Sequence, residues 1–503
     1  MFRLFRRYSV LGLTLLGGAT TVALAQPQPL ELTPRDLLFR AFTKNLDLQV
    51  QLLEVDISRD REIIAGEDLV PQFTVRLSRD SSQSALNQRE FFGAGGIRIF
   101  EEDAWSAGAG VSALMPYGTL VELETNSTRL KNSTNRRPDS PFFPEVQSSA
   151  RVVLTQPLLR GRGSDFVLAP LRLQESTTRA TEWDTRASFE QIAAQLLLTA
   201  WENQFALDNI RVKEEAVELA QTLARENRRR VEEGMMADID VTQAEVRVAE
   251  AREELIRARS LYRERQDVLW NLTSDEGDLD RIPIRVVGLE EALPELETER
   301  VNLLRTMLER NPIYRGALAQ AEAENIRVAF AENLQLPQID LRASLGYNGL
   351  DDGWAGSISD FGDRSGPDWS LGLTATLPLD RRVDRARLRE AQRGKRQTLL
   401  SIKRTERDLY VTLDQVLLNL RDAEERMELV RESVRLAEEA LRAEERRLES
   451  GLTTTFNVLN QQRELSQAQS RALAAEVDWQ RSKLDLRLMQ GNLSESLGFA
   501  FNP

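Results

Sequence analysis

The sequence reads N-P-I-Y-R at residues 311–315 and L-P-Q at 336–338. This pair of segments indicates how the chain is built, because a similar pair occurs earlier in the sequence. Residues 45–49 read N-L-D-L-Q, and residues 70–72 read V-P-Q. The asparagine precedes the proline by 26 residues in both places. The matching order and spacing are typical of an internal duplication, which builds symmetric objects from equivalent halves.

Two further landmarks follow in the same order. T-Q-P-L at 155–158 corresponds to T-L-P-L at 376–379, and G-x-x-x-x-x-[DN]-V occurs at 234–241 and at 451–458. The sequence therefore predicts two repeats between a leader and a tail. A signal peptide is predicted at 1–25 and a C-terminal tail at 492–503. The first repeat, 26–298, is predicted to contain strands at 70–160 and a helical hairpin at 165–272. The second repeat, 299–491, is predicted to contain strands at 337–380 and a helical hairpin at 383–490.

Composition excludes most catalytic sites. The 503 residues include no cysteine and no histidine, so disulfides, thiolate nucleophiles and histidine-dependent triads are impossible. No phosphate-binding glycine loop of the P-loop or dinucleotide type is present. We expect no cofactor, no metal site and no catalytic residue. The 79 acidic residues are expected mainly on solvated helix faces.

The first 25 residues have the pattern of a secretory signal. Arg3, Arg6 and Arg7 precede an apolar run at 10–16, and Ala23-Leu24-Ala25 fits a cleavage site. The whole chain carries a net charge of −13, which argues against a nucleic-acid partner. No later stretch approaches the ~20 apolar residues that a membrane-spanning helix needs. A closed β-barrel is the other way for a chain to cross a membrane.

Segments of two different compositions alternate along the chain. Residues 33–66, 165–272, 299–334 and 383–490 are rich in helix-forming residues, and we expect 165–232 and 383–449 each to form one continuous helix of on the order of 100 Å. Small and apolar residues recur there at coiled-coil spacing. Helices of this length suit a tall bundle or tube.

In the other segments, apolar residues alternate with small or polar residues at every second position. Ile339, Leu341, Ala343 and Leu345 share one face of a predicted strand, while small or polar residues occupy the other face. Such runs of about ten residues fit transmembrane barrel strands, and they also fit an ordinary sheet with one solvated face. Few strands per chain cannot close a barrel, so several chains would have to contribute.

The first strand region is longer than the second. Its surplus includes residues 105–125, which we interpret as an added hairpin around a turn at 116–119. The sequence leaves open whether this hairpin joins a barrel or packs beside it. Residues 79–104 and 126–148 are polar, and we expect them to form loops.

The two glycine motifs read as tight helix reversals. Gly234 and Gly451 can end a helix in the left-handed conformation, and Asp240 and Asn457 are candidate caps of the next helix, with residues 453–455 as an alternative in the second motif. A simple reversal accounts for these residue types, so the function depends on where the tips lie.

With its duplicated glycine motifs, its L-P-Q segment and T-Q-P-L-L-R-G-R-G at 155–163, the chain resembles the TolC-like outer-membrane efflux proteins. The resemblance implies a homotrimer in which each protomer gives four strands to one barrel in the lipid of the outer membrane. A helical tube continues from this barrel into the periplasm. A periplasmic adaptor protein and an inner-membrane pump would dock at its tip. The implied docking residues are Gly234, Met235, Ala237, Asp240, Val241, Gly451, Leu452, Thr453, Asn457 and Val458.

The entrance lining departs from the family pattern. Acidic positions of the best-known members correspond here to Asn457 and Asn460, whereas Asp238 and Asp240 of the first motif could still form an acidic collar.

The predicted fold is mainly α, a long coiled-coil helical barrel plus a transmembrane β-barrel shared by three protomers. The predicted function is the passive outer-membrane channel of a tripartite efflux or type I secretion system.

Two other classes of function remain as alternatives. An exported coiled-coil structural or surface protein without channel activity would explain the helices but not the two alternating strand regions. An exported carboxylate-dependent hydrolase would need a deep pocket, which long thin helices do not make. Cargo and pump class leave no mark in the sequence.

Overall fold

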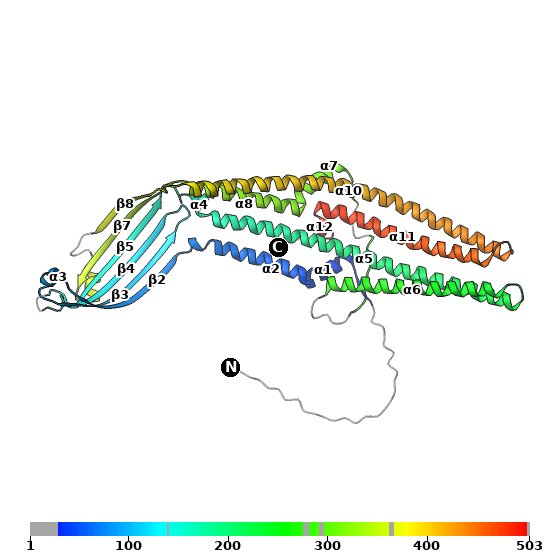
Figure 1. Ribbon diagram of the computed structural model, residues 1–503, viewed down its shortest axis with the longest axis horizontal. Helices are drawn as coiled ribbons and strands as arrows, with labels where there is room; N and C mark the ends of the chain where they lie inside the picture. Colours follow the sequence, from blue (N-terminus) through cyan, green and yellow to red (C-terminus); the bar gives the residue numbers. More distant parts are fainter. Residues whose placement is uncertain (1–28, 138–139, 275–280, 291–295, 362–366, 500–503) are drawn as a thin grey trace, which may run out of the picture.

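The computed structural model describes residues 29–137, 140–274, 281–290, 296–361 and 367–499. It is an elongated molecule with a β-sheet at one end and a long helical body that ends in two helical hairpins (Figure 1). The predicted signal peptide and the end of the predicted tail lie outside the described residues. No helix in the described ranges combines the length and the hydropathy that a bilayer span requires.

One antiparallel sheet contains six strands in the order β2-β3-β4-β5-β7-β8. The strands are β2 (Gln72–Ala85), β3 (Ile99–Leu114), β4 (Leu120–Asn132), β5 (Glu145–Pro157), β7 (Gln338–Asp351) and β8 (Asp368–Thr376). The added hairpin is β3–β4, and it lies inside the sheet between β2 and β5. The sheet thus has six strands, where the resemblance implied four per protomer.

The strands are also longer than the sequence analysis predicted. Parts of 79–104 and 126–148 were expected to be loops, but β2 extends to Ala85, β3 begins at Ile99 and β4 extends to Asn132. These ends are mostly polar, so the period-two alternation that identifies a half-buried strand is absent there. Only the short helix α3 (Gln88–Gly93) interrupts the β2–β3 connection.

The predicted alternation places apolar side chains on one face of the whole sheet. Cross-strand pairs on this face include Phe73 with Val111, Leu123 with Val152, and Leu345 with Trp369. All six side chains are exposed in the single chain. The opposite face carries polar and small residues, such as Arg76, Ser106, Gly108, Gly110, Glu124, Asn126, Arg151 and Ser344.

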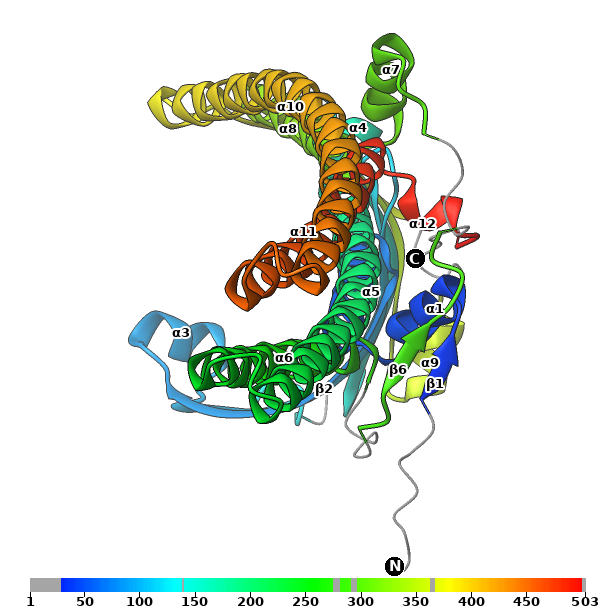
Figure 2. The ribbon, with the colours of Figure 1, turned by 90° about the vertical axis from the view of Figure 1, so that its right-hand side faces the viewer.

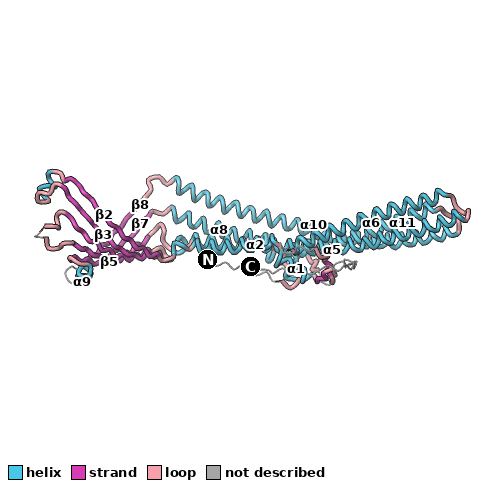
Figure 3. Tube along the Cα trace, turned by 90° about the horizontal axis from the view of Figure 1, so that it is seen from below, coloured by secondary structure: helices cyan, strands magenta, loops and turns pink. Residues whose placement is uncertain are grey.

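The short helix α9 (Trp354–Ser359) lies against the apolar face at its outer end (Figure 3). The hydroxyls of Ser357 and Ser148 are 2.7 Å apart, and Val146 on β5 is fully buried. This face therefore has a fixed protein cover at one end and an open apolar surface over the rest.

Four long helices continue from the sheet: α2 (Leu46–Ala65), α5 (Ala169–Glu232), α8 (Pro312–Leu334) and α10 (Arg382–Glu449). They pack side by side in the order α2, α5, α8, α10. The predicted continuous helices are present, with 64 residues in α5 and 68 in α10. The first begins slightly later than predicted, because the short helix α4 (Ser164–Val167) precedes it.

Farther from the sheet, α6 (Asp238–Thr273) and α11 (Thr455–Gln490) take over from α2 and α8. Here α6 packs on α5, and α11 packs between α5 and α10. Viewed from the hairpin end, the helices form a curved layer, and the smaller elements lie on its convex side (Figure 2). These are α1 (Pro34–Lys44), α7 (Arg300–Arg310), α12 (Leu493–Ser496), and the parallel pair β1 (Leu30–Leu32) and β6 (Ile284–Val286).

Two of the predicted helical segments are broken by asparagine. Residues 33–66 divide into α1 and α2 at Asn45, and residues 299–334 divide into α7 and α8 at Asn311. Each asparagine accepts a hydrogen bond from the backbone of the third residue after it, so its side chain caps the following helix. Helix-forming composition on both sides concealed these breaks in the sequence.

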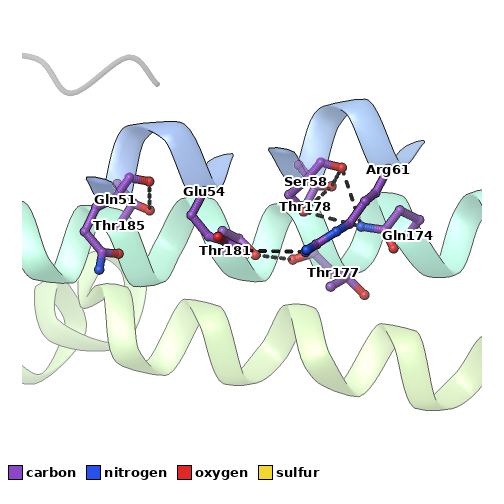
Figure 4. Close-up of polar contacts among 9 residues, drawn as sticks. All are labelled: Gln51, Glu54, Ser58, Arg61, Gln174, Thr177, Thr178, Thr181 and Thr185. Carbon is purple, nitrogen blue, oxygen red and sulfur yellow. Dashed lines mark hydrogen bonds and ion pairs between the residues drawn. The ribbon is translucent and has the colours of Figure 1, made fainter. Parts of the chain in front are cut away.

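The main hydrophobic core lies at the middle of the body, where α1, α5, α6, β6 and α12 meet around Leu37, Leu196, Leu269, Ile284 and Leu493. A second cluster joins α7, α10 and α11 around Met307, Leu413 and Leu486. Nearer the sheet, the described helices are held together by small polar side chains instead of a hydrophobic cluster. Ser58 of α2 and Thr178 of α5 are both buried, and their hydroxyls are 3.0 Å apart (Figure 4). Such small polar residues let the helices approach closely.

Candidate channel entrance at the helical tip

Both helical hairpins reverse through a left-handed glycine. Gly234 has φ +73° and Gly451 has φ +70°. In the first turn the Met235 N–H donates to the Arg230 carbonyl at 2.8 Å, and in the second the Leu452 N–H donates to the Arg447 carbonyl at 2.8 Å. This six-residue closure satisfies helix-end carbonyls, and it confirms that each motif is a tight reversal.

The predicted caps Asp240 and Asn457 are wrong, whereas the alternative at 453–455 contains Thr454, the residue that precedes α11. Helix α6 begins at Asp238 after Ala237, and α11 begins at Thr455 after Thr454. Neither Ala237 nor Thr454 makes a side-chain capping bond. Asp240 and Asn457 lie inside the first turn, where the carboxylate of Asp240 interacts favourably with the positive end of the helix dipole. The sequence analysis therefore placed these two caps three residues too late.

Large apolar side chains are exposed at each tip. Met235 is 67% and Leu452 70% exposed, and each directly follows its glycine. Ile239 is 59% and Phe456 54% exposed, and each lies five residues after its glycine. The prediction named Met235 and Leu452 but missed Ile239 and Phe456, although their equal spacing from the glycine was visible in the sequence.

The remaining apolar tip residues hold the hairpins together. Val458 is 1% exposed and packs with Leu223, Leu448 and Leu459 in a cluster that also contacts Met236. The cluster joins α5, α10 and α11. Val458 therefore fixes the tip from inside, whereas Val241, named beside it from sequence, is only half-buried.

The polar residues of the second tip bond to one another. The Thr453 hydroxyl donates to the carboxylate of Glu444 on α10, and the Asn457 side-chain amide donates to the Thr453 hydroxyl at 3.0 Å. Asn460 accepts from Arg463, one turn along α11. Thr453 and Asn457 thus brace the turn, a role that sequence reasoning did not assign.

The predicted acidic collar lies on α6. Asp238 is exposed and Asp240 is half-buried, and in the described part of the chain neither carboxylate forms an ion pair. The Asp240 backbone carbonyl accepts from the side-chain amide of Asn227 on α5 at 3.2 Å, which ties the start of α6 to the preceding helix. No group of three or more acidic side chains within the described ranges is arranged to hold a metal ion.

A charged cluster above the tip was missed entirely. Glu254 of α6 lies 3.1 Å from the ammonium group of Lys213 on α5 and 3.2 Å from the guanidinium of Arg247. Burial raises the pKa of Glu254, but these two cations lower it by more, so its pKa lies below the ordinary value. Lys213 also donates to the Ser466 hydroxyl at 3.0 Å, which links α5, α6 and α11.

This arrangement has a counterpart in known proteins. Residues 303–492 match the family model described as outer membrane efflux protein. These residues belong to the outer membrane efflux protein family. The match agrees with the predicted resemblance to the TolC-like efflux proteins over these residues. The location in the outer membrane, with the helices in the periplasm, stays a prediction. No curated protein sequence matches the chain significantly.

Solved structures share the fold over nearly the full length. The outer-membrane channel OprN is 17% identical, with a TM-score of 0.66 over 91% of this chain and 89% of that chain. The Campylobacter jejuni outer-membrane channel CmeC is 14% identical, with a TM-score of 0.65 over 96% and 94%. The Neisseria gonorrhoeae outer-membrane channel MtrE, solved in its open state, is 14% identical, with a TM-score of 0.62 over 91% and 88%.

Proposed function

We propose that three copies of this chain assemble into an outer-membrane export channel that carries cargo passively from the periplasm to the exterior. The observation that carries the proposal is the sheet, whose edge strands β2 and β8 have no partner on their outer sides within the described chain. Six alternating strands leave β8 antiparallel to the β2 of a neighbouring copy, so three copies can close a barrel without an exposed edge.

The outer surface of such a barrel suits lipid. The exposed apolar side chains of the sheet share one face, while the charged and small residues face the other way. A barrel with this pattern presents an apolar band to the bilayer and a polar wall to its lumen.

The helical body supports the same assembly. In the layer next to the sheet, α2 and α10 are the edge helices. On one edge α2 exposes Val50, Leu53 and Ile57, and on the other α10 exposes Leu400 and Val411. Isolated apolar side chains are ordinary at a protein surface, but rows along two opposite edges mark interfaces. Joining the edges of three copies would cover both rows and close a tube.

We assign docking of a periplasmic adaptor to the tip, and through the adaptor docking of an inner-membrane pump. Met235, Ile239, Leu452 and Phe456 offer exposed apolar contacts at the end that points away from the sheet. The remaining predicted tip residues, Gly234, Ala237, Asp240, Val241, Gly451, Thr453, Asn457 and Val458, would shape and support this surface. Energy would come from the pump, and the channel would need no catalytic residue.

The proposal includes the internal repeat. Asn45 and Asn311 occupy matching positions, since each caps a helix that leads to the sheet and each donates to a carbonyl near the end of α6 or α11. The two repeats at 26–298 and 299–491 would then be pseudo-equivalent parts of the tube.

The decisive experiment measures assembly and conduction together. Protein extracted from outer membranes should have the mass of a trimer in detergent and should conduct ions across planar bilayers. A soluble or monomeric rod without conductance would favour the exported coiled-coil protein instead. Docking is tested with a photo-crosslinking residue at Leu452 or Phe456, where the adaptor should be captured. The same probe at Leu436, an exposed residue on α10, is the matched control.

A further inference from the structure

The hairpin β3–β4 is built into the wall rather than attached to it. The register pairs β2 with β3 from Gln72 to Ala85, and β4 with β5 from Leu120 to Leu130. One row runs Val75, Ala109, Thr125, Ala150 across four neighbouring strands. Every residue of this row lies on the apolar face, so the hairpin continues the lipid-facing pattern without a break.

The periplasmic turn of the hairpin is tied to the base of the sheet. The Gly163 N–H donates to the Tyr117 carbonyl at 3.1 Å, and the Thr119 hydroxyl donates to the side-chain carbonyl of Gln156. Gly118 has φ +94°, and a Cβ there would lie 2.6 Å from the Gly161 carbonyl oxygen. The turn therefore has a fixed seat between β5 and the start of α4.

We infer that three copies form a barrel of eighteen strands, so that the duct stays as wide through the membrane as along its helical body. The inference rests on the proposed trimer. Each copy contributes the six strands of one sheet. Strands spaced about 4.8 Å apart and tilted by about 40° would give a backbone diameter of roughly 36 Å for eighteen strands, against roughly 24 Å for twelve.

The helical layer has a matching width. Each copy places four helices side by side next to the sheet, α2, α5, α8 and α10. At interaxial distances of 8–10 Å, twelve helices would form a tube of roughly 31–38 Å between opposite axes. At the same tilt, eighteen strands meet this diameter, whereas twelve strands would make a narrower barrel. The hairpin is thus the element that sets the width of the exit. A barrel of eighteen strands would enclose an aqueous channel, as other barrels of 16–18 strands do.

Cysteine pairs test this placement directly, because the chain has no cysteine of its own. Val75→Cys with Ala109→Cys, and Thr125→Cys with Ala150→Cys, join neighbouring strands and should form disulfides in the trimer. Val75→Cys with Ala150→Cys is the matched control. These two positions are three strands apart, about 14 Å, and a disulfide reaches less than about 7 Å. A twelve-stranded wall that excludes the hairpin would bring them together.

A second variant measures the width. Deleting residues 99–132 removes the hairpin and leaves β2 and β5 antiparallel, so that they can pair with each other. The barrel would then be narrower, and the largest neutral polymer that can enter from the outer side should be smaller in diameter by about a third. Deleting 88–93, which removes only α3, should leave that limit unchanged. A disulfide between positions 75 and 150, or an unchanged polymer limit without the hairpin, overturns the inference alone. Failure to recover a trimer overturns the proposed function as well.

Discussion

The side-chain amide of Asn311 donates a hydrogen bond to the backbone carbonyl of Met489, 3.0 Å away and 178 residues later in the chain. The same side chain accepts from the Tyr314 N–H and so caps α8. Asn311 is 4% exposed. One buried residue thus sets both the break between α7 and α8 and the attachment of that break to the end of α11.

Replacing Asn311 should therefore destabilise the protein at two points. Asn311→Ala is expected to cost about 2 kcal/mol, since it removes a helix cap and leaves a buried carbonyl unpaired. Asn311→Ser should recover part of the loss, because it restores the cap acceptor only. The heating midpoint of trimer dissociation measures both changes. Asn419→Ala, at an exposed position of α10, is the control, and an equal effect there would contradict the assignment.

The tip turn should depend on backbone conformation alone. At Gly451 a Cβ would meet nothing within 4 Å, so Gly451→Ala adds only the strain of a left-handed alanine, about 1 kcal/mol. Gly451→Asn should cost less, because asparagine tolerates this conformation. Thermal unfolding of the three proteins tests the order. Equal midpoints for alanine and asparagine would show that another contact governs the turn.

The Glu254 cluster predicts a pH dependence. The pKa of Glu254 is lower in the folded protein than its unfolded value of about 4.3, so the stability from its pairing with Lys213 and Arg247 is complete above that value. This stability is lost as the pH falls through the folded pKa. Glu254→Gln should lower the unfolding midpoint by an amount equal to about 1 kcal/mol at neutral pH.

The difference between wild type and Glu254→Gln should shrink below about pH 4.5, as the wild-type carboxylate becomes protonated. Glu253→Gln is the neighbouring control, since Glu253 is exposed and pairs only with Arg257 among the described residues. A difference that stays constant down to pH 3 would refute the role assigned to the cluster.

The proposed acidic collar can be tested by divalent cations, which favour carboxylate oxygens. Asp240→Ala should weaken the block of single-channel current by added calcium on the periplasmic side, and Asp238→Ala should add to this effect. Asn457→Ala is the control, because its amide already bonds to Thr453. A block of the same strength in Asp240→Ala would reject the collar.

Much of the fold was visible in the sequence because it depends on local pattern. The period-two faces of β7 and β8 and the long helices α5 and α10 were all predicted, since each repeats its own spacing over many residues. The turn glycines were found because glycine adopts the left-handed conformation with less strain than any other residue. The breaks at Asn45 and Asn311 were missed because they depend on carbonyls more than 170 residues away.

The candidate site divides in the same way. The offsets from Gly234 and Gly451 located the tip, and they would also have identified Ile239 and Phe456. The pairing of Lys213 with Glu254 could not be seen, because it depends on how α5 and α6 lie against each other.

By itself the sequence determined the alternation of strands and helices, the two reversals and the family to which residues 303–492 belong, because each depends on residues close together in the chain. Only the tertiary structure decided that β3 and β4 enter the sheet between β2 and β5. A hairpin carries the same alternation whether it joins a sheet or lies beside it, and hydrogen bonds to distant strands settle which of the two occurs.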